Sequence, residues 1–201
     1  MTFQAINVIP LRYRARVRLF VAAYPPAAAC DDLSARLDGL AVIKAHAAGV
    51  NTRPARRETW HVTLAFLGEV ADDRSPRAAE ALERAAVGPP VTLRLAGGGR
   101  FGRGRFTVLW VGVEGDGLDG LARRVRHELR KSKIAYDDRA LRPHLTVARP
   151  GDRLDRATIE ADQAALAAYE GPPWPISEIR LVRSHLGPQP AYDRVAGFPL
   201  G

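Results

Sequence analysis

The sequence of 201 residues is poor in cysteine and contains no long apolar run. Its single cysteine, Cys30, excludes a disulfide within the chain and any metal site built from several cysteines. Such low cysteine content is typical of a reducing compartment, so we expect a cytoplasmic protein. No run approaches the roughly eighteen apolar residues of a membrane span, and no small-residue cleavage site follows the apolar N-terminal residues. We therefore expect neither a membrane partner nor a signal peptide.

Positive charge exceeds negative charge in this sequence. Thirty lysines and arginines stand against 22 aspartates and glutamates, which gives a net charge of +8 and a pI near 10.3. Such a field attracts polyanions, so it favours a nucleic acid or a phosphate-bearing partner. A genome that favours alanine and arginine would produce the same balance, so charge alone leaves the partner open.

Short apolar runs, which are typical of strands, alternate with amphipathic stretches at helical spacing. In chain order we expect a strand at 18–24, a helix at 27–47, a strand at 60–68, a helix at 76–87, strands at 91–95 and 106–113, a helix at 116–131, a strand at 144–148, a helix at 154–169, and strands at 176–186 and 192–198. The glycine-rich stretch 97–102 fits the dinucleotide-binding spacing only formally, because a strand rather than a helix follows it. We expect a loop there.

The two halves of the chain repeat one order of elements. Each has an apolar strand, a helix with an acidic start, a basic loop and a second strand, which indicates an internal duplication and two similar α+β lobes. Residues 1–16 fit no element, and we expect them to form a flexible N-terminal extension. Residues 17–201 contain no linker rich in serine, glycine or proline, so we expect a single bilobal domain.

The duplication carries a short pattern that occurs twice, H-V-T-L-A from His61 and H-L-T-V-A from His144. Chance predicts about 0.2 H-x-T triplets in such a chain. In a strand, residues i and i+2 project from one face about 6.5–7 Å apart, so His61 with Thr63, and His144 with Thr146, would each share a face. Two duplicated lobes that face each other would bring both pairs to one cleft.

These residue types suit chemistry at phosphorus. An imidazole has an ordinary pKa near 6.5, so one ring can donate a proton while the other accepts one. Threonine hydroxyls can donate hydrogen bonds to phosphoryl oxygens. The alternatives are histidines with satisfied hydrogen bonds in a core, and a zinc or iron site. A metal site would require a third protein ligand, which neither strand supplies.

The motifs H-V-T-L-A-F-L-G and R-P-H-L-T-V-A-R resemble the twin motifs of the 2H phosphoesterase superfamily. The similarity is closest to its RNA 2′,3′-cyclic phosphodiesterases, historically called 2′-5′ RNA ligases, and it extends to R-L-F-V-A-A-Y-P-P, F-T-V-L-W-V-G-V-E-G-D and the C-terminal stretch from Leu181. The resemblance implies an α+β fold of two antiparallel-sheet lobes with outer helices and a central cleft. The second motif has H-L-T-V where H-L-T-L is usual, a change on the packed face.

The resemblance also implies hydrolysis of RNA 2′,3′-cyclic phosphate ends to 2′-phosphates without a cofactor or metal. His61 would be the proton donor to the leaving 3′ oxygen, and His144 the acceptor that activates water. Thr63, Thr146 and Arg149 would bind the phosphate. The partners would be RNA or nucleotide ends, with tRNA fragments as one source, and the protein would act as a monomer.

Other patterns carry weaker hypotheses. Arg100, Arg103 and Arg105 could line an RNA entrance or could simply be solvated. The remaining histidines with no partner motif, which we expect at the surface, are His46, His127 and His185. The aromatics that we expect mostly in the core are Trp60, Phe66 and Trp110.

Two other functions stay open from the sequence. One is an RNA-binding or 2′-5′ RNA end-joining protein with little hydrolytic turnover, and the other is a sister 2H enzyme that acts on another cyclic phosphate.

Overall fold

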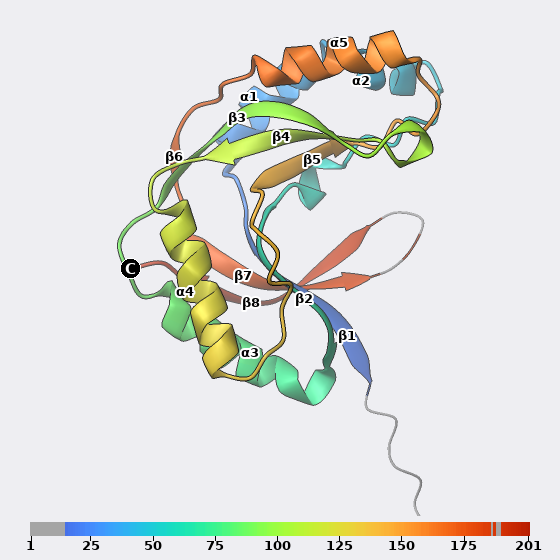
Figure 1. The fold of residues 1–201 in the computed structure, drawn as a ribbon. Helices are drawn as coiled ribbons and strands as arrows, with labels where there is room; N and C mark the ends of the chain where they lie inside the picture. Colours follow the sequence, from blue (N-terminus) through green and yellow to red (C-terminus); the bar gives the residue numbers. More distant parts are fainter. Residues whose placement is uncertain (1–14, 186, 188–189) are drawn as a thin grey trace, which may run out of the picture.

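The structure is a computed structural model that describes residues 15–185, 187 and 190–201 (Figure 1). Most of the predicted N-terminal extension, residues 1–14, lies outside this part. Arg16 already belongs to the first strand, where it pairs with Ala71, and the carbonyl of Ala15 accepts a hydrogen bond from the Asp72 amide. The folded part therefore includes the last two residues of the segment that we expected to be an extension.

Two four-stranded antiparallel sheets form the centre of the fold. The first sheet has the order β2-β1-β7-β8, with β1 (Arg16–Ala23), β2 (Val62–Ala71), β7 (Glu178–His185) and β8 (Ala191–Pro199). The second sheet has the order β5-β4-β3-β6, with β3 (Thr92–Phe101), β4 (Val108–Glu114), β5 (His144–Ala148) and β6 (Trp174–Pro175). The prediction of an α+β fold with two antiparallel sheets is confirmed.

Helices cover the outer face of each sheet (Figure 1). The helices are α1 (Ala27–Leu37), α2 (Ala41–Ala47), α3 (Ser75–Ala86), α4 (Leu118–Lys131) and α5 (Arg156–Ala167), with 3-10 turns at Arg57–Thr59, Asp72–Arg74 and Gly104–Phe106. The pair α3 and α4 packs on the first sheet, while α5 packs on the second sheet beside α1 and α2. No helix in the described part of the chain is both long and apolar enough to cross a membrane.

Each lobe draws on both halves of the chain, which the sequence repeat did not reveal. Strand β7 lies in the second half of the chain but pairs with β1 of the first half. The first helix of each repeat packs on the sheet of the other lobe: α1 contacts β3 in the second sheet, and α4 contacts β2 in the first. One hydrophobic core consequently runs through both lobes, from Leu19 in β1 to Leu145 in β5.

The predicted helix at 27–47 is wrong in one respect, because it is two helices that are separated at residues 38–40. The buried carboxylate of Asp162, from α5, accepts hydrogen bonds from the amides of Ala41 at 2.8 Å and Val42 at 2.9 Å. These amides open α2, and a helix start leaves such donors without an intrahelical partner. A distant side chain therefore sets this helix start, and local spacing could not show it.

The predicted loop at 97–102 is also wrong, since β3 runs through the glycines to Phe101. A Cβ on Gly98 would lie 2.7 Å from the Cβ of Leu166 in α5, and a Cβ on Gly99 would lie 2.7 Å from the indole of Trp110. Gly97 has a φ of +63°, at a register shift between β3 and β4. The glycines permit a close approach of helix and indole to the strand.

We predict that Gly98→Ala lowers the free energy of unfolding by about 1–3 kcal/mol, because the added methyl group overpacks the contact with α5. Gly120→Ala is the matched control: its Cβ would meet only the Arg124 side chain, at 3.9 Å, in the helix α4. Alanine is the better helix former, so this variant should gain about 0.5–1 kcal/mol. Urea unfolding measures the change in the free energy of unfolding for both variants. Changes of the same sign and size would contradict the packing argument.

Candidate active site

The segment that leads into the first motif is hydrogen-bonded to the strand that carries the second. The amide of Ala55 donates to the carbonyl of Val147 at 2.7 Å, and the amide of Arg149 donates to the carbonyl of Arg53 at 3.0 Å. Pro54 and Ala148 form an isolated antiparallel bridge between these bonds. This pairing ties the approach to His61 to the edge of β5.

The two motifs occupy equivalent places in their sheets. Strands β2 and β5 are both edge strands, and each pairs with the first strand of its own repeat. In β2 the residues Val62 and Leu64 are buried, and Thr63 between them is half-buried. In β5, Leu145 and Val147 are buried, and Thr146 between them is half-buried. His144, which opens β5, and His61, which directly precedes β2, are also half-buried. The prediction that each H-x-T presents a histidine and a threonine on one face is confirmed.

Both histidines make the same hydrogen bond to the backbone. The Nδ1 of His61 lies 2.7 Å from the carbonyl oxygen of Thr59, and the Nδ1 of His144 lies 2.7 Å from that of Arg142. A carbonyl oxygen can only accept, so each Nδ1 carries the hydrogen and donates it. Each neutral ring then has an unprotonated Nε2. This bond orients the ring and selects its tautomer. The H-x-T pattern did not predict it, because the acceptor is a backbone carbonyl.

Aromatic rings surround His61. Its ring centre lies 4.8 Å from that of Phe20, 5.9 Å from that of Tyr24, and 5.1 Å from that of Tyr192, whose ring is nearly perpendicular. Burial lowers the pKa of His61 below its ordinary value, the hydrogen bond to the Thr59 carbonyl opposes this shift, and the charge of His144 adds to the lowering. The two imidazoles therefore lie within electrostatic reach of each other.

His144 has different surroundings. Its ring is 4.9 Å from that of Phe101, at a nearly perpendicular angle, and 6.3 Å from that of Trp110. Phe101 and Trp110 stack at 5.1 Å, in the space that Gly99 leaves open. The duplicated motif is thus placed in two unequal environments. Sequence reasoning missed Phe20, Tyr24, Phe101 and Tyr192, because β1 with its end, β3 and β8 bring these rings to the two histidines without a local signal.

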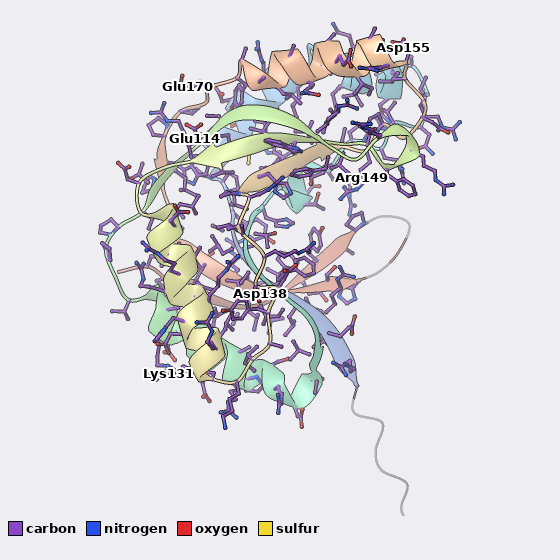
Figure 2. The ribbon with its side chains drawn as sticks, viewed as in Figure 1. Glu114, Lys131, Asp138, Arg149, Asp155 and Glu170 are labelled. Carbon is purple, nitrogen blue, oxygen red and sulfur yellow. The ribbon has the colours of Figure 1, made fainter. Side chains whose placement is uncertain are left out.

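Arg149 is exposed and follows β5 directly (Figure 2). Burial raises the pKa of the Tyr192 hydroxyl, and the charges of Arg149 and Arg18 act in the opposite direction. Since Tyr192 packs against His61, the guanidinium of Arg149 lies in electrostatic reach of the site. Within residues 15–185, 187 and 190–201, Arg149 has no ion pair, and the hydroxyls of Thr63 and Thr146 have no hydrogen bond.

The other residues singled out from the sequence lie away from these two motifs or in supporting positions. His46, His127 and His185 are exposed, as expected, and His185 contacts Asp193 at 2.6 Å. Trp60 is buried, as expected, while Phe66 and Trp110 are half-buried. In the basic loop, Arg57 pairs with Asp31 at 2.5 Å and Arg56 donates to the carbonyl of Pro190.

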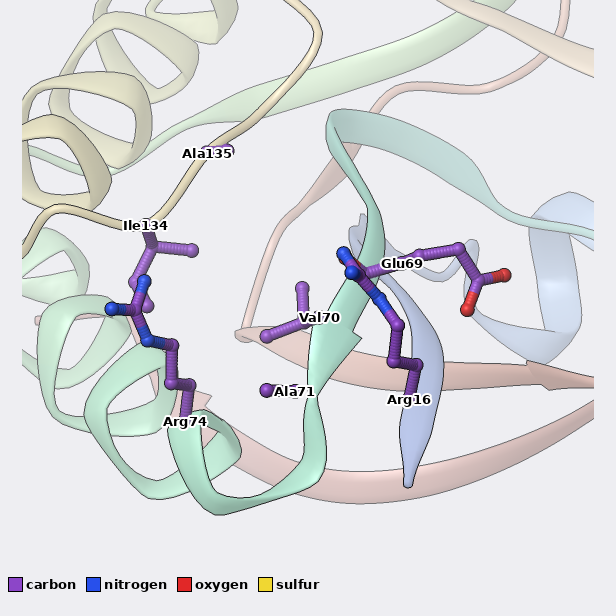
Figure 3. A pocket seen from close by; sticks show the side chains of 7 residues that line it. All are labelled: Arg16, Glu69, Val70, Ala71, Arg74, Ile134 and Ala135. Carbon is purple, nitrogen blue, oxygen red and sulfur yellow. The ribbon is translucent and has the colours of Figure 1, made fainter. Parts of the chain in front are cut away.

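Two surface cavities in the described part of the chain are lined by neither His61 nor His144. One, of about 340 Å³, lies at the start of β1 and the end of β2 (Figure 3). It is lined by Arg16, Glu69, Val70, Ala71, Arg74, Ile134 and Ala135. The other, of about 380 Å³, adjoins the start of β3 and the end of β4. The described residues also contain no group of three His, Cys, Asp or Glu side chains that could hold a metal. The central cleft between the lobes stays a prediction.

The sequence model of the 2′-5′ RNA ligase superfamily matches residues 25–188, which include both motifs. The chain belongs to this superfamily. It is 34% identical over 146 residues to an RNA 2′,3′-cyclic phosphodiesterase of Geobacillus stearothermophilus, a match that covers 71% of this chain and 46% of the relative. The chain thus spans about half the length of the curated relatives that it matches.

Two solved structures are similar across their length. A crystal structure of TT0787 of Thermus thermophilus has a TM-score of 0.67 and 26% identity, with 91% of this chain and 97% of that chain covered. A crystal structure of Escherichia coli LigT complexed with 3′-AMP has a TM-score of 0.64 and 25% identity, with 92% and 98% covered.

We predict that His61 is neutral at pH 7 in the free protein, with its hydrogen on Nδ1, and that it titrates below pH 6.5. Its pKa is lowered by burial, so the cation forms only as the pH falls through that lowered value. Long-range 1H–15N correlation spectra of the imidazole nitrogens measure both the tautomer and the titration. A hydrogen on Nε2 would contradict the orientation by the Thr59 carbonyl.

Proposed function

We propose that the protein hydrolyses RNA 2′,3′-cyclic phosphate ends to 2′-phosphates, and that this chemistry uses no metal. The observation that carries the proposal is the matched pair of imidazoles, each fixed through Nδ1 by the carbonyl two residues before it. Membership of the superfamily and the name of the Geobacillus relative support the same activity.

In the proposed reaction, the Nε2 of His144 accepts a proton from water, whose oxygen forms a bond to phosphorus. The bond from phosphorus to the 3′ oxygen breaks, and His61 gives that oxygen its Nε2 proton. The 2′ ester is kept, so the product is a 2′-phosphate. Thr63 and Thr146 donate hydrogen bonds to the non-bridging oxygens, and Arg149 balances their charge.

Burial of His61 agrees with the role of a proton donor. A lowered pKa makes the imidazolium a stronger acid, so it transfers its proton more readily to the 3′ oxygen. In the free protein little of His61 is protonated at neutral pH. The negative charge of a bound phosphate raises the pKa of His61, so the ring takes up a proton when substrate binds. Substrate binding and protonation of His61 are therefore linked.

A second function uses the same groups. If a 5′-hydroxyl replaces water, the attacking oxygen joins two RNA ends through a 2′-5′ bond, which is the activity that the superfamily is named for. An RNA-binding protein with little turnover and a sister enzyme on another cyclic phosphate are the remaining alternatives. A substrate panel of cyclic phosphates, with and without an RNA that has a 5′-hydroxyl, separates these functions by product.

Several further properties are proposed. We infer a cytoplasmic monomer whose substrates include tRNA-derived ends, and a single bilobal domain that begins at β1. Light scattering measures the monomer directly.

We predict that the protein converts a 2′,3′-cyclic mononucleotide to the 2′-phosphate alone, at the same rate in excess EDTA. His61→Ala and His144→Ala should each lower kcat by about 10²- to 10⁴-fold, because each removes one proton transfer. His127→Ala, which changes an exposed histidine on α4, is the matched control. Loss of activity in EDTA, or activity kept by the double variant of His61 and His144, would refute the proposed mechanism.

The two histidines should differ on a substrate with a good leaving group. A p-nitrophenyl phosphodiester needs no proton on its leaving oxygen, so His61→Ala should recover most of its lost activity there, while His144→Ala should not. The ratio of kcat values on the two substrates, measured for both variants, tests the assignment. The reverse pattern would show that His61 is the proton acceptor and His144 the donor.

A further inference from the structure

The turn between β3 and β4 combines arginines with an exposed aromatic ring. The hairpin tip, residues 101–106, has the sequence F-G-R-G-R-F. Phe106 is 69% exposed, and the other large hydrophobic side chains that are exposed in the described part are valines, Val87 and Val195. An exposed aromatic ring beside arginines offers a face on which a nucleic-acid base can stack.

The backbone holds this ring in place. Gly102 and Gly104 have φ values of +67° and +54°, and a Cβ on Gly102 would lie 2.4 Å from the carbonyl oxygen of Phe106. The amide of Phe106 donates to the carbonyl of Arg103, and the amide of the buried Thr107 donates to that of Gly104. The backbone that carries the ring is therefore held in a tight turn, so less backbone entropy is lost when a ligand binds there.

Positive charge accompanies the ring. The guanidinium carbon of Arg105 lies 4.7 Å from the ring centre of Phe106, and Arg103 and Arg105 are both exposed. In the part of the chain that the structure covers, neither arginine has an ion pair. Arg100, in contrast, is half-buried within β3, one residue before the tip begins. An exposed aromatic ring with one guanidinium beside it and a second exposed arginine nearby fits single-stranded nucleic acid, whose bases stack and whose phosphates carry charge.

The hairpin tip adjoins the catalytic motifs. Phe101 is opposite Val108, Leu109 is opposite Ala148, and Arg149 follows Ala148, so the tip and Arg149 lie at the same end of the second sheet. Figure 2 shows Arg149 on that side of the molecule. The ring of Phe101 also reaches back to within 4.9 Å of the His144 ring. Phe101 thus lies between the His144 ring and the turn that carries Phe106.

The register sets the distance between His144 and the tip. His144 is opposite Gly112, and Val108, two residues after the tip, is four residues away along β4. Four residues of strand span about 13 Å, which corresponds to about four stacked nucleotides at 3.4 Å each, or fewer if the strand is extended. A mononucleotide held at the histidines is too short to reach Phe106.

We propose that the hairpin tip binds the unpaired nucleotides on the 5′ side of the cyclic phosphate end. Phe106 stacks on a base, and Arg103 and Arg105 contact phosphates. The inference rests on the proposed function, since the histidines define where the RNA end is held. It makes the preferred substrate a single-stranded RNA of several nucleotides. A base within a duplex is already stacked and paired, and cannot lie flat on this ring.

The test compares kcat/KM for a six-nucleotide single-stranded RNA and for a mononucleotide with the same 2′,3′-cyclic end. Phe106→Ala should lower the ratio of the two values by about 5- to 30-fold, and Phe106→Tyr should restore it. The pair Arg103→Ala and Arg105→Ala should lower the ratio and reduce the slope of log kcat/KM against log salt by about 1.4, which is 0.7 for each phosphate contact.

Matched controls lie on the helical layer that covers the first sheet. Val87→Ala removes another exposed hydrophobic side chain just after α3, and Arg77→Ala removes an exposed arginine within α3. Both should leave the ratio unchanged. A ratio that also stays unchanged in Phe106→Ala, or falls equally in the controls, overturns the proposal. The proposal is also overturned if a duplex RNA with a blunt 2′,3′-cyclic end raises kcat/KM over the mononucleotide as much as the single strand does.

Binding separates this proposal from the proposed function. A fluorescent six-nucleotide RNA that ends in a 2′-phosphate gives a Kd without turnover, and Phe106→Ala should weaken it by the same 5- to 30-fold. If the protein hydrolyses neither substrate but the Kd shifts, the hairpin tip binds RNA and the proposed reaction fails. If hydrolysis proceeds and the Kd does not shift, the tip inference fails alone. If binding is weakened only in the arginine variants, the tip attracts RNA through charge alone, and the inference that Phe106 stacks on a base is overturned.

Discussion

The site depends on one backbone pairing, between residues 53–55 and the end of β5. Edge strands carry unpaired amides and carbonyls, and both motif strands, β2 and β5, are edges of their sheets. The bonds from Ala55 to Val147 and from Arg149 to Arg53 satisfy part of the β5 edge. They also hold the segment that enters β2. Together with the shared hydrophobic core, this pairing fixes the two motifs relative to each other.

Duplication supplies two equal motifs, and the fold makes them unequal. The Nδ1 bonds to the carbonyls of Thr59 and Arg142 have the same length, so orientation and tautomer come from the repeated backbone. The difference lies in what packs on each ring. Phe20, Tyr24 and Tyr192 bury His61, while His144 has Phe101 and Trp110 beside it. Desolvation shifts the pKa of His61. Two acid–base roles can thus arise from one repeated pattern.

The sequence predicted those features that local pattern determines. Period-two alternation placed His61 with Thr63 and His144 with Thr146, and apolar spacing found each helix to within a few residues. It failed where a distant group decides. The Asp162 carboxylate divides the helix at 27–47, and the contacts of Gly98 and Gly99 with Leu166 and Trp110 turn a glycine-rich stretch into strand. The aromatic rings around the histidines come from strands far apart in sequence, so no local pattern could assemble them.

The pairing of a late strand with an early one has a consequence for synthesis. The order β2-β1-β7-β8 places β7 against β1, so a strand that ends at Ala23 pairs on one side with residues that begin at Glu178. While a ribosome builds the chain from the N-terminus, β1 has one unsatisfied edge until nearly the last strand emerges. Such long-range pairing closes a large loop and is intrinsically slow. The first sheet therefore becomes complete only after β7 and β8 have been made, and until then its exposed edge is a surface on which a nascent chain can associate with another.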